Sequence, residues 1–157
     1  MIFHVVAVGR LRNAALRDAC EEYLSRSQRY FTVTIHEVSP AVRGGRSPSD
    51  ARRQEGAALL RAIPGGAVAV ALTRDAGAED SLQFAERMAR WQRAARDVAW
   101  IIGGAHGLDP SVLEGCAHRV SLSPLTLPHE VARLILLEQI YRAGTILQRE
   151  PYHKGVR

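Results

Sequence analysis

The sequence predicts an α/β fold in which helices cover both faces of a mostly parallel sheet. Apolar runs typical of strands alternate with helical segments along the whole chain, which is the pattern of parallel sheets built from β-α-β units. Two of the runs, at 67–72 and 98–102, carry no polar residue. A strand that is apolar on both sides needs cover on both faces, so helices are expected above and below the sheet.

The first quarter of the chain predicts a strand, a helix and a second strand. Residues 2–8 are mostly apolar, and Gly9 ends the run. Residues 13–25 place leucine, alanine and cysteine side chains at helical spacing. Residues 32–38 are rich in β-branched side chains and stop at a Ser-Pro pair. The chain therefore starts as a β-α-β unit.

The middle of the chain repeats this order. A basic loop at 41–48 precedes a helix at 49–62, whose first residues are a serine and an aspartate that can cap it. A Pro-Gly-Gly turn then leads into the apolar strand at 67–72. Residues 81–93 carry an apolar helical stripe and precede the apolar strand at 98–102.

The last third predicts a short helix opened by Asp109 and Pro110, a brief strand at 118–121 and a long helix at 128–147. The long helix is apolar on two faces, which is wider than one core-facing stripe needs. We expect one face to pack on the sheet and the other, with Ile140, to pack on a second subunit.

A glycine-rich loop follows the strand at 98–102. Gly103, Gly104 and Gly107 allow a sharp turn and a close approach of the backbone to a ligand. Their spacing is not the G-x-G-x-x-G fingerprint, and the loop follows the fourth predicted strand, which argues against a Rossmann dehydrogenase. On the residues alone, a binding loop and a tight turn without a ligand stay equally open.

Two later segments mix apolar and polar residues. In the loop at 122–127, Pro124 stiffens the backbone while amides and carbonyls stay free for a polar edge such as that of adenine. An ordinary loop between a strand and a helix can have the same composition. In the tail, Tyr152, His153 and Lys154 offer a stacking ring, a titratable group and a cation, although most short basic tails are disordered.

These motifs occur in one order, as G-G-x-x-G-L, L-S-x-L-T-L-P-H, E-x-x-Y-R-A and P-Y-H-K. With them the chain resembles the RlmH (YbeA) family of SPOUT-class ribosomal RNA methyltransferases, over essentially its whole length. The resemblance implies a single domain over 1–157 with a C-terminal trefoil knot, a feature that periodicity cannot predict. Lys154 stands where the family has a basic residue, but three more residues follow it.

The resemblance also implies S-adenosylmethionine as the cofactor and no metal. It assigns the cofactor contacts to the residue that ends the third strand, to the glycine loop and to the following loop. These residues are Leu72, Gly103, Leu122, Ser123, Pro124, Leu125, Thr126 and Leu127.

The implied reaction is methylation of N3 of a pseudouridine in 23S ribosomal RNA, in the stem-loop that faces the decoding centre of the assembled 70S ribosome. Alignment supplies most of the acceleration of such a transfer, but the N3 imide must lose its proton. Tyr152, His153 and Lys154 are the expected catalytic residues, and His129 is a further candidate; the sequence does not choose a base. A homodimer could place the tail of one subunit over the cofactor of the other.

The charge balance agrees with an RNA partner. The chain has 21 Lys and Arg residues against 16 Asp and Glu residues, a net charge of +5, which favours a polyanionic partner without identifying it. Arg10, Arg142 and Lys154 are the expected RNA contacts, and Arg43 and Arg46 could add non-specific affinity for phosphates.

The remaining composition favours a cytoplasmic protein. Cys20 and Cys116 fit neither a disulfide scaffold nor a zinc site, and no apolar run approaches the roughly 20 residues that cross a bilayer. No membrane partner is therefore expected. Two other functions stay open: a non-catalytic RNA-binding or ribosome-binding module, and a regulatory protein that binds ATP or NAD.

Overall fold

The computed structural model describes residues 1–41 and 47–154, so Arg43 and Arg46 lie outside the described residues. The strands of the described part are β1 (Ile2–Val8), β2 (Thr32–Val38), β3 (Val68–Leu72), β4 (Val98–Ile102) and β5 (His118–Val120). The helices are α1 (Ala14–Ser27), α2 (Pro48–Ala62), α3 (Ser81–Arg93), α4 (Pro110–Gly115) and α5 (His129–Leu147).

The strands form one sheet in the order β2-β1-β4-β3-β5, and every neighbouring pair is parallel. The predicted parallel sheet is therefore confirmed. From β1 the chain continues to β2 on one side, and from β4 it continues to β5 on the other. The carboxyl ends of β1 and β4 thus meet at the point where the order reverses, which is where open α/β sheets form a ligand crevice.

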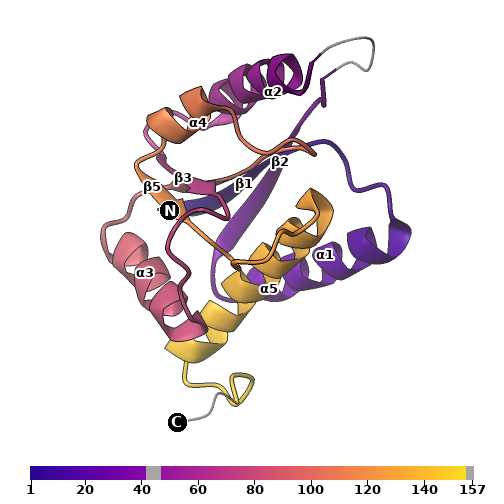
Figure 1. The fold of residues 1–157 in the computed structure, drawn as a ribbon. Coiled ribbons are helices and arrows are strands. Elements are labelled where there is room, and N and C mark those ends of the chain that lie inside the picture. The colour runs from indigo at the N-terminus through magenta and orange to yellow at the C-terminus, as the bar shows by residue number, and fades with distance from the viewer. Residues whose placement is uncertain (42–46, 155–157) are drawn as a thin grey trace.

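Helices cover both faces of the sheet, as predicted. Figure 1 shows α2 and α4 on one side and α1, α3 and α5 on the other. Alternation along β1 builds both cores, because Val5 packs in the cluster with α1, α3 and α5 while Val6 packs in the cluster with α2 and α4. Trp100 in the central strand is fully buried and stacks on Phe84 of α3, with 5.2 Å between ring centroids.

Local capping fixes where the helices begin. The side chain of Asn13 accepts a hydrogen bond from the Leu16 amide at the start of α1. In α2 the cap is Ser47, which lies before the predicted start of that helix. The reason is that Pro48, which has no amide hydrogen to satisfy, occupies the first helical position.

The prediction that Ile140 of α5 lies at a subunit interface is wrong. Ile140 is fully buried within the single chain, as are Leu136 and Leu137. Helix α5 packs beneath the sheet with α1 on one side and α3 on the other, so its wide apolar surface is used inside one subunit (Figure 1).

Among residues 1–41 and 47–154, no helix has both the length and the apolar character required to cross a membrane.

Candidate active site

Two cavities lie at the carboxyl edge of the sheet. The first, here called the β1-side cavity, has a volume of about 1160 Å³ and lies among the segments that follow β1, β2 and β4. The second, the β5-side cavity, has a volume of about 850 Å³ and lies among the segments that follow β3, β4 and β5. The two cavities share Gly104, Ala105, His106 and His129 as lining residues, so they adjoin each other.

The β5-side cavity gathers residues that were predicted from three separate segments. Seven of the eight expected cofactor residues line it, and Pro124 lies in the same loop without lining it. The seven are Leu72, Gly103, Leu122, Ser123, Leu125, Thr126 and Leu127. The fold therefore brings together residues up to 55 positions apart because parallel strands place their carboxyl ends at one edge.

Gly103 makes the tight turn of the glycine loop possible. A Cβ atom at this position would lie 2.7 Å from the carbonyl carbon and oxygen of Gly107. Gly107 has a φ of +78° and its amide donates to the Gly104 carbonyl at 3.1 Å. The loop is thus a tight turn whose backbone also forms a wall of the cavity.

Polar side chains hold the loop at 122–127 in place. The Ser121 hydroxyl donates to the Ser123 carbonyl at 2.9 Å, and the Ser123 hydroxyl accepts from the Leu125 amide at 3.0 Å. Arg74, in the loop after β3, donates to the Thr126 hydroxyl at 2.8 Å. Leu125 itself is 72% exposed. An apolar side chain on the rim of a cavity is suited to cover a bound ligand.

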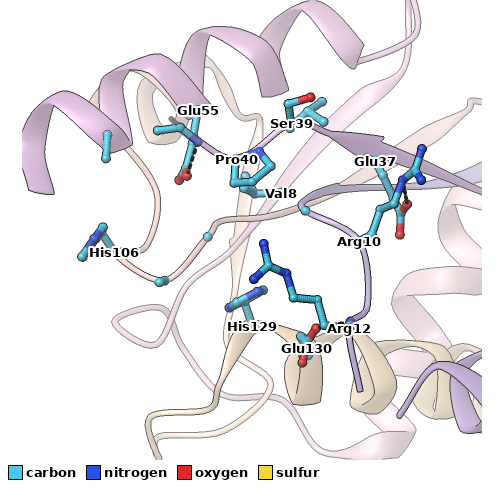
Figure 2. Close-up of a pocket in the computed structure, with 16 residues that line it drawn as sticks. Val8, Arg10, Arg12, Glu37, Ser39, Pro40, Glu55, His106, His129 and Glu130 are labelled. Atoms are coloured by element: carbon cyan, nitrogen blue, oxygen red, sulfur yellow. Dashed lines mark hydrogen bonds and ion pairs between the residues drawn. The ribbon is translucent and has the colours of Figure 1, made fainter. Parts of the chain in front are cut away.

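Seven of the 16 residues that line the β1-side cavity have charged or titratable side chains (Figure 2). Arg10 is largely exposed and lies 4.0 Å from Glu37. The backbone amide of Arg12 donates to Glu130 at the start of α5, at 2.8 Å. In Figure 2 the Arg12 side chain extends toward His129. The cavity also holds the carboxylates of Glu37, Glu55 and Glu130, so it offers both cations and anionic acceptors to a ligand.

The tail residues pack on the second half of α5. The Tyr152 hydroxyl donates to Glu138 at 3.1 Å, and its ring packs on Tyr141 with 4.8 Å between centroids. The Arg142 guanidinium lies over the Tyr152 ring, forms a 2.6 Å ion pair with Glu138 and lies 3.4 Å from His153 Nδ1. Arg142, a predicted RNA contact, is thus engaged within the chain, where it orders the tail.

This position separates the tail from both cavities of the same chain. Helix α5 begins at His129 beside the cavities, and the tail packs on Glu138, Tyr141 and Arg142, which lie about 14–20 Å further along the helix at 1.5 Å per residue. The structure therefore does not bring Tyr152, His153 and Lys154 together with the predicted cofactor residues in one subunit.

The surroundings of Tyr152 determine its protonation state. Burial, the hydrogen bond with Tyr23 and the charge of Glu138 raise the pKa of Tyr152 far above its usual range. The hydrogen bond with Glu138 also raises the pKa of Arg142. In this arrangement Tyr152 is a neutral phenol that donates a hydrogen bond, so it is not a base.

Sequence reasoning placed some residues of the β1-side cavity and missed others. Arg10 and His129 were predicted and line it, and His106 lines both cavities. Arg12 and Glu55 were missed. Arg12 had a signal, since it lies in the loop after the first strand together with Arg10. Within the described ranges, no group of three or more His, Cys, Asp or Glu side chains is arranged to hold a metal ion.

Comparison with known proteins agrees with this architecture. The family described as "Predicted SPOUT methyltransferase" matches residues 1–153. A protein of Gemmatimonas aurantiaca named ribosomal RNA large subunit methyltransferase H is 43% identical over 150 residues, which cover 96% of this chain and 97% of the relative. The chain belongs to the RlmH family of SPOUT methyltransferases. An RlmH protein of an Anaeromyxobacter species is 44% identical over 154 residues, which cover 98% of this chain and all of the relative.

Solved structures share the fold of this RlmH family member at low sequence identity. A methylase family protein of Haemophilus influenzae superposes with a TM-score of 0.58 at 11% identity, over 99% of this chain and 71% of the other. A methylase family protein of Neisseria gonorrhoeae superposes with a TM-score of 0.54 at 14% identity, over 99% of this chain and 87% of the other. These likenesses show that the fold is shared with methylase family proteins, in agreement with the SPOUT family match.

Proposed function

We propose that this protein is a cytoplasmic, single-domain enzyme that transfers a methyl group from S-adenosylmethionine to N3 of a pseudouridine in 23S ribosomal RNA. Its substrate is the assembled 70S ribosome. One observation carries the proposal: the loops expected to hold the cofactor surround one cavity, and that cavity adjoins a second one lined by arginines. The trefoil knot implied by the family belongs to the same proposal.

The residues of the β5-side cavity fit S-adenosylmethionine. Leu72 and Leu127 provide apolar surface for an adenine ring, and the loop at 122–127 provides backbone amides and carbonyls. Gly103 keeps the backbone free of a side chain on another wall, and Asp75 contributes a carboxylate to the lining. S-adenosylmethionine supplies an activated methyl group; the residues of the chain bind and orient it.

The β1-side cavity fits the RNA. Arg10 and Arg12 can contact phosphates on either side of a target nucleotide, which positions the RNA without reading its sequence. Such contacts make binding fall steeply as the salt concentration rises. The cavity they border leaves room for a base next to the walls shared with the β5-side cavity.

Removal of the N3 proton needs a titratable group near both cavities. Within one chain, His129 lies in the lining of both and is fixed at the start of α5. We expect His153 to contribute from a second subunit, because it lies beside Arg142, about 20 Å along α5 from His129. The test replaces each histidine with alanine and compares how the turnover rate depends on pH. The rate falls at low pH where the base becomes protonated, and only loss of the base removes this fall.

The separation between tail and cavities supports a homodimer with shared sites. Chains carrying Gly103→Ala lack a cofactor site, and chains carrying His153→Ala lack the tail group, so each variant alone is expected to be inactive. Mixed dimers hold one complete site, and an equal mixture is expected to recover roughly a quarter of the wild-type activity. If the mixture stays inactive although mixed dimers form, the shared site is excluded.

The experiment that tests the proposed function is transfer of labelled methyl groups to ribosomes from cells lacking this gene. Intact 70S ribosomes, 50S subunits and free 23S RNA are compared, and the modified nucleoside is mapped. Label in 3-methylpseudouridine, mainly in 70S particles, is the expected result. Stabilisation by ATP or NAD but not by S-adenosylmethionine in a thermal-shift assay would instead support a regulatory nucleotide-binding protein. RNA binding without cofactor binding would support a non-catalytic module.

A further inference from the structure

Glu55 is a buried carboxylate with one oxygen unused. The residue lies in α2 and is 7% exposed. Its Oε1 accepts a hydrogen bond from the Ala41 amide at 3.0 Å, whereas Oε2 is buried and has no hydrogen-bond partner among the described residues. A buried charged oxygen without a donor is costly, so an unsatisfied one in a cavity wall indicates a missing ligand donor.

The unused oxygen lies in the β1-side cavity, next to a residue that lines both cavities. A Cβ atom on Gly104 would lie 2.6 Å from Glu55 Oε2, so only the lack of a side chain at Gly104 leaves room for the carboxylate. Gly104 lines both cavities. Glu55 lines the β1-side cavity, and it is not among the described residues that line the β5-side cavity. Figure 2 shows the Glu55 side chain directed from α2 into the cavity.

The rest of the β1-side cavity restricts the ligand. Arg10, Arg12 and His129 line it (Figure 2). Three carboxylates line it as well: Glu37 pairs with Arg133, Glu130 accepts from the Arg12 amide, and Glu55 keeps a buried oxygen without a partner among the described residues. Cations suit the phosphates of a nucleic acid, while a single buried anionic acceptor suits one N–H donor. The fitting ligand is therefore a nucleotide in an RNA chain whose base carries a ring N–H.

We propose that Glu55 Oε2 accepts the N1–H of the target pseudouridine and so selects this base over uridine. The inference rests on the function proposed above. Pseudouridine is joined to its ribose through C5, so its N1 keeps a hydrogen atom, whereas N1 of uridine carries the ribose. In pseudouridine, N1–H and N3–H lie on either side of the C2 carbonyl, so both can be contacted from different walls.

The location of Glu55 favours recognition of N1 over removal of the N3 proton. The electron pair with which N3 attacks lies in the ring plane, in the direction that its proton occupied. A base for N3 must therefore stand on the side from which the methyl group arrives, which is the side of the β5-side cavity. Since Glu55 lines only the other cavity, its oxygen is placed for the neighbouring N–H. Glu55 is thus a specificity residue.

Ribosomes with and without the target pseudouridine test this role. Particles that contain pseudouridine come from cells lacking this gene, and particles that contain uridine come from cells lacking both this gene and the pseudouridine synthase. A site that hydrogen-bonds a donor rejects an analogue without it, so wild-type kcat/KM should be at least about 100-fold higher on pseudouridine.

The variant Glu55→Gln converts the acceptor into a donor with almost no change in shape. The Ala41 amide holds the side-chain oxygen at Oε1, so the NH₂ group must occupy the position of Oε2 and face the N1–H. We expect kcat/KM on pseudouridine to fall about 100-fold while kcat/KM on uridine changes less than about twofold. Glu86→Gln, at an exposed position of α3, is the matched control and should behave as wild type.

Further readouts separate this role from a structural one. Binding of S-adenosylmethionine to Glu55→Gln, measured by calorimetry, should equal that of the wild type, and its melting temperature should not fall. Were Glu55→Gln to fail to fold, Glu55→Asp would replace it, because it keeps the charge and withdraws the oxygen from the base. The ratio of kcat/KM on pseudouridine to kcat/KM on uridine should then fall, while the affinity for S-adenosylmethionine should not change.

Each other outcome has a definite meaning. Full activity of Glu55→Gln on pseudouridine, or equal wild-type activity on both substrates, would overturn the inference and leave the proposed function intact. Equal losses on both substrates with a displaced acidic limb of the pH profile would make Glu55 a general base instead. Absence of methyl transfer by the wild type on every particle would refute the proposed function, and the inference would fall with it.

Discussion

The guanidinium of Arg133 in α5 donates to the carboxylate of Glu37 in β2, with 2.6 Å between Nη1 and Oε1. Its Nη2 donates to the Gly9 carbonyl at 2.7 Å. Arg133 is 1% exposed, whereas the Glu37 side chain keeps 32% of its surface exposed. One buried cation therefore joins α5 to the ends of β1 and β2, and it fixes the helix that begins at His129 beside both cavities.

This asymmetry in burial predicts unequal costs for removing the two partners. Glu37→Ala leaves a buried guanidinium without its anion and should lower the free energy of unfolding by about 3–5 kcal/mol. Arg133→Met leaves a carboxylate that water can still reach and should lower it by about 1–3 kcal/mol. Urea denaturation measures both values, with the exposed Glu86→Ala as control. Equal costs or the reverse order would contradict the assignment of Arg133 as the buried member.

Gly103→Ala should weaken cofactor binding without unfolding the protein. The added Cβ would lie 2.7 Å from the Gly107 carbonyl, so the glycine loop must move away from its place in the β5-side cavity. We expect the affinity for S-adenosylmethionine, measured by calorimetry, to fall by at least about tenfold, because the displaced loop no longer contacts the cofactor. A tenfold loss corresponds to about 1.4 kcal/mol of binding free energy. Gly77→Ala is the control, since a Cβ there meets nothing within 4 Å. Unchanged affinity in Gly103→Ala would refute the role of this loop.

The sequence was sufficient to predict features that depend on local pattern. Apolar runs such as 98–102 predicted the strands, and the helical segments between them predicted a parallel sheet. Both predictions rest on local periodicity and on the burial that it implies. The glycine loop and the loop at 122–127 were also found locally. Parallel topology then required both loops to lie at the carboxyl edge of the sheet, where they line one cavity.

Features that depend on tertiary packing could not be predicted. Glu55 lies in a polar stretch of α2 and has no feature that distinguishes it from a solvated carboxylate; its burial arises only when α2 docks over the Gly104 loop. Ile140 was misassigned for a related reason. A helix that is apolar on two faces can pack on a partner subunit or between two helices of its own chain. Here α5 packs between α1 and α3 of the same chain.

Gly144→Ala should destabilise the protein although alanine favours helices. A Cβ at position 144 of α5 would lie 2.3 Å from Cγ of Tyr30, whose ring packs directly on the helix backbone. Because Tyr30 is also held by Glu150 through a 2.5 Å hydrogen bond, the ring cannot simply turn away. We expect the free energy of unfolding to fall by about 1–3 kcal/mol, as for other overpacked cores. Thermal unfolding measures the effect. In Gly65→Ala the added Cβ meets no atom within 4 Å, so this control should melt close to the wild type. Equal melting temperatures for the two variants would contradict the close packing of Tyr30 on Gly144.

His4 predicts a specific dependence of stability on pH. It lies in the sheet with its Nδ1 2.8 Å from the Thr34 hydroxyl and 3.0 Å from His36 Nε2, and its Nε2 lies 3.7 Å from Asp97. Burial, followed by the neighbouring charge of His36, lowers the pKa of His4 below 6.5, while Asp97 opposes the shift. As the pH falls below about 6.5, the unfolded chain therefore binds more protons at this residue than the native protein does, and the free energy of unfolding must decrease.

Urea denaturation at several values between pH 7 and pH 5 isolates this contribution. The Ile2 amide holds the pKa of Asp97 below 3.8, so the stability that Asp97 contributes is lost only below that value and stays constant in the chosen window. His4→Gln, which keeps a polar partner for Thr34, should flatten the dependence of stability on pH relative to the wild type. His118→Gln, at an exposed position of β5, serves as the control. If His4→Gln kept the full wild-type slope, the acid sensitivity would arise elsewhere in the chain, and His4 would bind as many protons in the native protein as in the unfolded chain, which would contradict the lowered pKa.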